Sequence, residues 1–94
     1  MAVVEREATI VNPLGMHARP AAALVKIAAK FASAIEVRRD EMTVNAKSIM
    51  GVMMLAAERG ATIVFRAEGD DAEAAVAALC ELVAAGFNEM DLTE

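Results

Sequence analysis

Residues 12–23 read Asn-Pro-Leu-Gly-Met-His-Ala-Arg-Pro-Ala-Ala-Ala, and this stretch predicts a loop that passes directly into a helix. Asn, Pro and Gly favour the loop. Pro20 suits the first turn of a helix, and residues 18–31 carry the apolar spacing of one. The only histidine of the chain, His17, therefore lies where loop becomes helix, two residues before Arg19.

This junction has the chemistry of an anion site. Backbone N–H groups at a helix N-terminus lack intrahelical partners and carry a partial positive charge, which suits phosphate. His17 is a candidate nucleophile there, and the backbone of Ala18 and Arg19, with the Arg19 guanidinium, is a candidate phosphate ligand. The alternative is that His17 is an ordinary polar surface residue, which its residue type alone favours.

The remaining chain alternates short strands with helices. Segments rich in β-branched residues or alternating in polarity predict four strands, at residues 3–11, 34–39, 42–45 and 62–68. Apolar residues at helical spacing predict three helices, at residues 18–31, 48–57 and 72–85. One α+β domain over residues 1–94 follows, with an antiparallel sheet covered on one face by helices. Residues 88–94 are expected to form a flexible acidic tail.

Capping residues mark the predicted helix ends. Ser48 is the expected N-cap of the helix at 48–57, where its hydroxyl can accept a backbone N–H. Asp70 and Glu73 have the spacing of a capping box for the last helix. Gly60 and Gly86 are expected just after the ends of the second and third helices.

Composition excludes several classes of function. The hydrophobic fraction of 57 % is inflated by 22 alanines, and no apolar run reaches the ~18 residues of a membrane-spanning helix. No signal-peptide pattern is present, so a soluble cytoplasmic protein is expected. The net charge of −5 argues against nucleic acid as a partner. Cys80 is the single cysteine, lies far from His17 in sequence and falls on an apolar stripe, which predicts a buried, inert residue and no metal site.

Two surfaces of the predicted helices have a functional and an ordinary interpretation. The helix at 48–57 is too short to bury every apolar side chain, which favours an adaptable exposed surface over a fully covered helix. The methionines expected to point in different directions are Met50, Met53 and Met54. Lys26 and Lys30 lie four residues apart on a polar face. That face is ordinarily solvated, and the functional alternative is that Lys26 helps to dock acidic partners.

Two blocks of the sequence carry a family resemblance. Residues 12–20 resemble the active-site signature of HPr, the histidine phosphocarrier of the bacterial phosphoenolpyruvate-dependent sugar phosphotransferase system. Residues 44–53, Val-Asn-Ala-Lys-Ser-Ile-Met-Gly-Val-Met, resemble the regulatory-serine segment of that family. The blocks stand in the family's order and spacing, and the resemblance covers essentially the whole chain. It implies an open-faced β-sandwich with the order β-α-β-β-α-β-α.

The resemblance implies a phosphoryl carrier rather than a turnover enzyme. Enzyme I, charged from phosphoenolpyruvate, would pass a phosphoryl group to Nδ1 of His17, with Arg19 stabilising the phosphate. The carrier would then donate the group to a histidine of an enzyme IIA domain, as a monomer without metal or cofactor. Residues carried over as a docking rim are Met16, Ala18, Lys26, Ile49, Met50 and Met53.

Ser48 would be the target of an HPr kinase/phosphorylase by the same resemblance. Its residue type and position alone favour a helix cap without a regulatory role. A phosphate at Ser48 would meet the positive end of a helix and add up to about two negative charges.

Other functions stay open. Met16 and the Ala-Gly-Phe of residues 85–87 favour the related carrier of the nitrogen branch, whereas residues 47–51 favour the sugar branch. The chain could instead be a regulatory binding module that acts through the Ser48 helix. A hydrolytic enzyme ranks third, because no carboxylate or base is recognisably paired with His17. No residue of the tail at 88–94 is carried over to the site.

Overall fold

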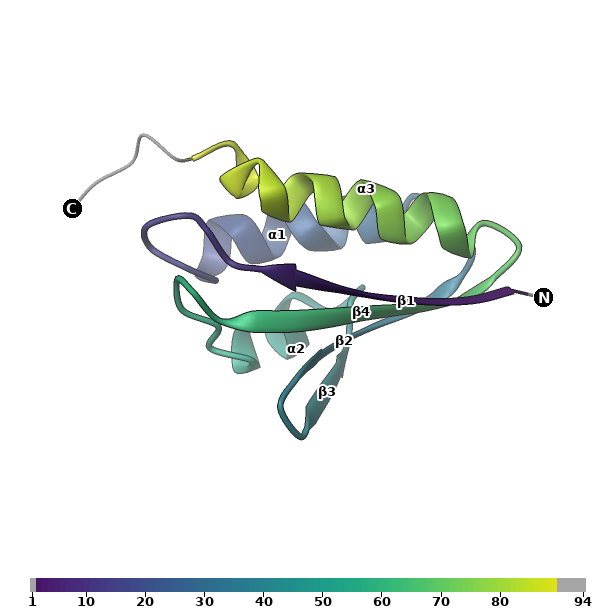
Figure 1. The fold of residues 1–94 in the computed structure, drawn as a ribbon, viewed down its shortest axis with the longest axis horizontal. Helices are drawn as coiled ribbons and strands as arrows, with labels where there is room; N and C mark the ends of the chain where they lie inside the picture. Colours follow the sequence, from purple (N-terminus) through teal and green to yellow (C-terminus); the bar gives the residue numbers. More distant parts are fainter. Residues whose placement is uncertain (1, 90–94) are drawn as a thin grey trace.

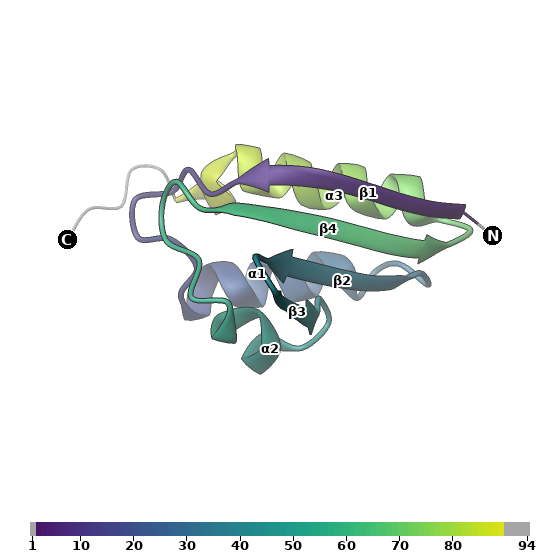
Figure 2. The same ribbon diagram turned by 60° about the horizontal axis from the view of Figure 1, so that its bottom comes forward.

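Four strands form one antiparallel sheet in the order β1-β4-β2-β3 in the computed structural model, which describes residues 2–89. The strands are β1 (Ala2–Thr9), β2 (Ala34–Arg39), β3 (Met42–Asn45) and β4 (Thr62–Gly69), and the helices are α1 (Ala18–Ala28), α2 (Ile49–Met54) and α3 (Ala72–Ala84). Figures 1 and 2 show α1 and α3 side by side on one face of the sheet. The shorter α2 packs against α1 and β3. The predicted fold class, an open-faced α+β sandwich with three helices, is confirmed.

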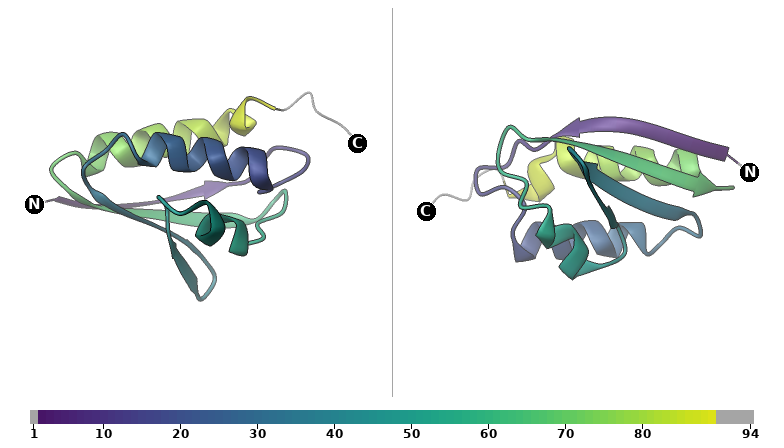
Figure 3. Two further views of the ribbon diagram at one scale, coloured as in Figure 1. Left: turned by 180° about the vertical axis from the view of Figure 1, so that it is seen from behind. Right: turned by 90° about the horizontal axis from the view of Figure 1, so that it is seen from below.

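The last strand in sequence, β4, lies inside the sheet between β1 and β2. Both neighbours pair with it in antiparallel register, so β1 and β2 run parallel to each other and need a crossover. Helix α1 supplies that crossover, and α2 supplies the corresponding one from β3 to β4. The start of α1 therefore lies at the end of the sheet where β1 ends and β4 begins, as Figure 3 shows from behind and from below.

Alternation along the strands builds the core. Ile63, Phe65 and Ala67 of β4 and Ile35 and Val37 of β2 are all buried beneath the helices, as their spacing predicts. The opposite face carries charged side chains that pair across strands, including Arg38 with Glu5 and Arg66 with Glu36. This face is exposed to solvent, and exposed ion pairs of this kind contribute little to stability.

Helix α2 is shorter than predicted, with six residues in place of the expected segment 48–57. The chain leaves the helix at Ala56, whose φ of 47° lies in the left-handed region. Arg39 then donates to the carbonyl oxygens of Leu55 (3.1 Å) and Ala56 (2.7 Å), which satisfies two acceptors at the helix end. The prediction that Gly60 follows the helix end is therefore wrong, because Gly60 lies in the turn before β4.

The ends of the other two helices differ only locally from the predictions. Helix α1 ends at Ala28 rather than residue 31. Helix α3 begins at Ala72 as predicted, but its N-cap is Asp71 rather than Asp70. The Asp71 side chain makes no cap hydrogen bond and Glu73 pairs with Arg6, so the predicted capping box is absent. Gly86 follows the end of α3 as predicted, with a φ of 65°.

The Asp71 carboxylate connects α3 to the loop between α1 and β2. It accepts the backbone N–H groups of Ala32 (2.8 Å) and Ser33 (2.9 Å) and the Ser33 hydroxyl, and so joins the start of α3 to the loop before β2.

Cys80 lies on α3 and is partly rather than fully buried, and desolvation raises the pKa of its thiol. A raised pKa disfavours the reactive thiolate, which agrees with the expected inert role. None of the helices within residues 2–89 has the length and hydropathy needed to cross a bilayer.

Candidate functional site

The loop between β1 and α1 is held at both ends by the segment that leads into β4. Ile10 donates to the carbonyl of Ala61 (2.9 Å) and accepts from Gly60 (2.7 Å), which extends the β1–β4 pairing beyond the strands. Six residues later, Met16 donates to the carbonyl of Ala57 (2.8 Å). The loop path, and with it the start of α1, is therefore fixed by backbone hydrogen bonds to a distant part of the chain.

Gly15 is the point of closest approach in this loop. Its φ is 69°, and a Cβ atom at this position would lie 2.8 Å from the Ala57 carbonyl oxygen and 2.9 Å from the Cα of Glu58. Both contacts are with backbone atoms, which cannot rotate away. The loop can pass this close to the neighbouring segment only because residue 15 has no side chain.

Asn12 organises the interior of the loop. Its side chain is fully buried, and Nδ2 donates to the Gly15 carbonyl oxygen and to Oε1 of Glu89, each at 2.8 Å. The backbone of Gly15 donates to the Asn12 carbonyl in return (3.1 Å). A single amide therefore closes the loop on itself and connects it to a residue 77 positions away.

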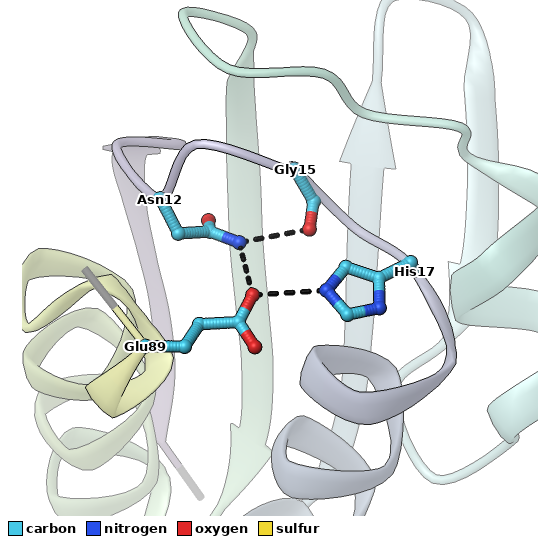
Figure 4. Close-up of polar contacts among 4 residues, drawn as sticks. All are labelled: Asn12, Gly15, His17 and Glu89. Atoms are coloured by element: carbon cyan, nitrogen blue, oxygen red, sulfur yellow. Dashed lines mark hydrogen bonds and ion pairs between the residues drawn. The ribbon is translucent and has the colours of Figure 1, made fainter. Parts of the chain in front are cut away.

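His17 is the N-cap of α1, as the sequence predicts for the junction of loop and helix. Its backbone is extended, and its carbonyl accepts the N–H of Ala21, which is the first bond of the helix. The side chain is 37 % exposed, and Nε2 lies 3.0 Å from Oε1 of Glu89. Figure 4 shows the second ring nitrogen, Nδ1, on the side of the ring nearer the first turn of α1. One ring nitrogen is thus engaged, and no partner for the other is found among residues 2–89.

Glu89 reaches His17 through a left-handed turn after α3. Gly86, Phe87 and Asn88 have φ values of 65°, 55° and 60°, and the Phe87 side chain is buried. This turn directs the chain back toward the loop, where Glu89 is only 5 % exposed. Its second oxygen, Oε2, is buried and has no hydrogen-bond partner among the described residues.

The expectation of a flexible tail from residue 88 differs from the structure at these first positions, since Glu89 is buried and bonded twice. Residues 90–94 of the expected tail lie outside the described residues. The sequence showed no carboxylate recognisably paired with His17 and no tail residue was assigned to the site, whereas Glu89 contacts His17 in the structure. Gly86 and Asn88, which tolerate left-handed backbone, were the signal that the chain turns back here.

The first turn of α1 presents the predicted anion-binding groups. The N–H groups of Ala18 and Arg19 precede the first helical hydrogen bond and therefore have no intrahelical acceptor, and Pro20 has no N–H at all. The Arg19 side chain is exposed and pairs with no carboxylate in residues 2–89. A free guanidinium and two free N–H groups thus adjoin the imidazole.

Helix α2 lies alongside α1 at the end where α1 begins, as Figures 2 and 3 show. Ser48 is its N-cap as predicted, with Oγ accepting the N–H of Gly51 at 3.0 Å. The helix exposes a group of large apolar side chains, and we call this group the α2 patch. It consists of Ile49, Met50, Met53 and Met54.

All of the residues predicted for the docking rim are exposed except one. Ala18 and Lys26 are exposed on α1, the helix against which α2 packs. Met16, in contrast, is 7 % exposed and packs into the hydrophobic core, so it is not available at the surface. Its backbone N–H is bonded to the Ala57 carbonyl, and its side chain belongs to the buried core cluster.

Comparison with known proteins points in one direction. Residues 4–85 match the family described as "PTS HPr component phosphorylation site". A phosphocarrier protein HPr of Cupriavidus necator is 45 % identical over 87 residues, which cover 93 % of this chain and 98 % of the relative. A phosphocarrier protein NPr of Shewanella violacea is 42 % identical over 89 residues, 95 % and 98 % of the two chains.

The fold comparison agrees with the sequence comparison. The crystal structure of an HPr from Thermoanaerobacter tengcongensis superimposes with a TM-score of 0.88 at 48 % identity. The match covers 92 % of this chain and 97 % of that one.

Proposed function

The chain belongs to the HPr family of phosphotransferase-system phosphocarriers, and we propose that His17 is the residue that carries the phosphoryl group. The observation that supports this assignment is the state of the imidazole ring. Nε2 is bonded to Glu89, whereas Nδ1 has no partner among residues 2–89 and lies beside the positive end of a helix. A nitrogen with a free lone pair next to an anion site can act as a phosphoryl acceptor.

In this proposal Nδ1 of His17 attacks the phosphorus of a phosphohistidine on enzyme I. The P–N bond to the donor breaks, its electron pair returns to the donor nitrogen, and a new P–Nδ1 bond forms. The N–H groups of Ala18 and Arg19 and the Arg19 guanidinium stabilise the charge on the phosphoryl oxygens during transfer and afterwards. The same steps in reverse donate the group to a histidine of an enzyme IIA domain.

A phosphorylation assay tests the assignment. The chain is incubated with enzyme I and phosphoenolpyruvate, and the added phosphoryl group is located by mass spectrometry under conditions that preserve phosphohistidine. We expect one phosphoryl group on His17 and none in a His17→Ala variant that remains folded. Labelling that persists in His17→Ala, or no labelling of the wild-type chain, would refute the proposal. In the second case the regulatory binding module becomes the better interpretation.

We propose that the α2 patch, with Ala18 and Lys26, forms the docking surface for both partners. These side chains are exposed on α1 and on the neighbouring α2, and flexible methionines suit a surface that must fit more than one protein. The charged centre with an apolar surround is typical of transient interfaces. Because His17, Arg19 and the patch all lie on one chain, we also propose that the monomer is the active form, which sedimentation during the assay checks.

Ser48 is proposed as a regulatory phosphorylation site of a kinase. It lies at the base of the α2 patch, so a phosphate would place negative charge within the apolar docking surface. We expect a Ser48→Asp variant to accept phosphate from enzyme I more slowly than wild type, with Ser48→Ala as the matched control. Equal rates for the Asp variant and wild type would remove this part of the proposal.

The branch of the phosphotransferase system is a separate question. We favour the sugar branch because residues 47–51 combine a helix-capping serine, Ser48, with the exposed Ile49 and Met50. The NPr relative at 42 % identity supports the nitrogen branch as a second candidate. Parallel transfer assays with the enzyme I of each branch discriminate between them, since the cognate donor should charge His17 faster.

A further inference from the structure

The hydrogen bonds behind His17 determine which ring nitrogen carries the proton. The Gly15 carbonyl oxygen can only accept, so the Asn12 atom that faces it is the amide nitrogen. The second N–H of that amide points at Oε1 of Glu89, which therefore accepts. The same oxygen lies 3.0 Å from Nε2 of His17, so this bond is satisfied when Nε2 is the donor. In the neutral ring, the lone pair is then on Nδ1.

From this chain of contacts we propose that Glu89 holds a proton on Nε2 of His17 throughout the transfer cycle. Glu89 is thereby a positioning residue that makes Nδ1 the only nucleophilic nitrogen and lets the ring leave as neutral imidazole. The inference rests on the proposed function of His17 as the phosphoryl carrier. It assigns to a residue of the C-terminal segment a role in the transfer chemistry.

The first half of the cycle creates a positive charge that Glu89 faces. When the Nδ1 lone pair forms the new bond to phosphorus, the Nε2 proton has not left, and the ring becomes a phosphorylated imidazolium. Its Nε2–H then donates to the Glu89 carboxylate as a charge-assisted hydrogen bond. The carboxylate is 5 % exposed, so the interaction is screened less than a surface pair would be.

The second half of the cycle depends on the same proton. When the P–Nδ1 bond breaks, its electron pair returns to Nδ1. With the proton still on Nε2 the departing ring is a neutral imidazole, whereas without it the ring would have to leave as an imidazolate anion. A proton kept on Nε2 therefore favours donation as well as acceptance.

The surroundings of Glu89 are consistent with this role. Within residues 2–89, His17 is the only basic side chain that contacts the Glu89 carboxylate. Asn12 holds Oε1 in place with a neutral amide, which fixes the oxygen without neutralising its charge. Arg19, two residues after His17, forms no ion pair with Glu89. The negative charge is thus directed at Nε2.

Chemical phosphorylation tests the proposal without enzyme I. Phosphoramidate transfers its phosphoryl group to histidine with loss of ammonia, and ¹⁵N and ³¹P NMR identify the nitrogen that receives it. We expect the wild-type chain to be labelled at Nδ1 alone. A Glu89→Ala variant frees Nε2, so phosphate should appear at Nε2 as well. Wild-type chain labelled at Nε2, or Glu89→Ala labelled at Nδ1 alone, would overturn the inference.

A second variant separates the effect of the Glu89 charge from that of its hydrogen bond to His17. It also provides a test if Glu89→Ala fails to fold. Glu89→Gln keeps an oxygen that can accept from Nε2–H but removes the charge. At mildly alkaline pH we expect its phospho-His17 to hydrolyse more slowly, by about tenfold, the factor for one charge-assisted hydrogen bond. Glu81→Gln, on the exposed side of α3, is the matched control and should keep the wild-type lifetime.

An unchanged lifetime in Glu89→Gln contradicts the inference, because a purely structural residue would not lengthen it. The assay with enzyme I tests the proposed function, and its outcome does not depend on the phosphoramidate results. If enzyme I fails to label His17 while the phosphoramidate results are as expected, the proposed function is wrong and the proton assignment is not.

Discussion

Gly15 and Asn12 show how single residues control the geometry around His17. Asn12 joins the loop to Glu89 through a buried amide, and Gly15 lets the loop lie against the backbone of residues 57 and 58. Neither residue is placed to touch a phosphoryl group. Both act by fixing where the imidazole and its carboxylate partner lie.

Substituting Gly15 with Ala should destabilise the fold and displace the loop. The new Cβ would lie 2.8 Å from the Ala57 carbonyl oxygen, and the alanine would have to adopt the left-handed backbone of Gly15. Both the clash and the backbone strain lower the free energy of unfolding. Gly60 is a matched control, because its φ is 93° but a Cβ there meets nothing within 4 Å. We expect Gly60→Ala to lower the free energy of unfolding by about 1–2 kcal/mol. Gly15→Ala should lower it by about 1–3 kcal/mol more than Gly60→Ala does. Urea unfolding of the two variants measures both, and equal losses would contradict the predicted clash.

At the scale of elements, α2 has a well-capped N-terminus and a strained C-terminus. Ser48 caps its first turn, but the residue after its last turn is an alanine in left-handed conformation, where glycine is usual. Arg39 compensates by donating to the two terminal carbonyls and by pairing with Glu58 at 2.5 Å. A backbone hydrogen bond and, after it, the positive charge of Arg39 lower the pKa of the exposed Glu58 carboxyl.

Replacing Ala56 with Gly should therefore stabilise the protein. The substitution relieves the left-handed strain at φ 47°, although it also adds freedom to the unfolded chain. We expect a net gain of about 1 kcal/mol in the free energy of unfolding. Ala85→Gly is the control, since Ala85 ends α3 at φ −80° and has no such strain to relieve. A loss of stability in Ala56→Gly comparable to that in Ala85→Gly would contradict the prediction.

At the scale of the whole molecule, the two ends of α3 hold the fold together. Asp71 at its start binds the loop before β2, and Glu89 beyond its end binds the loop before α1. Hydrogen bonds from the Ser33 hydroxyl and the Ala32 and Ser33 backbone lower the pKa of the Asp71 carboxyl below its usual range. Its contribution to stability therefore depends on pH.

The direction of that dependence follows from linkage. Because the Asp71 pKa is lower in the folded chain than in the unfolded chain, its stabilising effect is complete above the unfolded value of about 3.9. The effect is lost as the pH falls through the folded value. An Asp71→Asn variant also turns an NH₂ group toward backbone N–H donors.

We expect Asp71→Asn to be less stable than wild type at pH 7. The difference in stability between the two proteins should become smaller below about pH 4. Urea midpoints across this range measure it. Asp70→Asn, an exposed neighbour, is the matched control. A difference between Asp71→Asn and wild type that stays constant with pH would show that the carboxylate charge is not responsible.

Local patterns were enough to locate the elements and part of the site. The alternation of Ile35 and Val37, and of Ile63, Phe65 and Ala67, correctly predicted two strands and their buried face. His17 at the start of α1 and Ser48 as a cap follow from propensities that operate within a few residues. The predictions of helix ends failed where distant groups intervene: Arg39 binds the end of α2, and Ser33 binds Asp71, the residue that caps α3 in place of Asp70.

By itself, then, the sequence determined the order of strands and helices, the inward-facing side chains, and the meeting of an imidazole with a helix N-terminus. These features depend on periodicity and capping, which neighbours in the chain decide. Only the tertiary structure decided that Met16 is buried and that Glu89 bonds His17 across 72 positions. That contact depends on three successive left-handed residues after α3 and on a buried amide in another loop, and no local pattern encodes where two such loops meet.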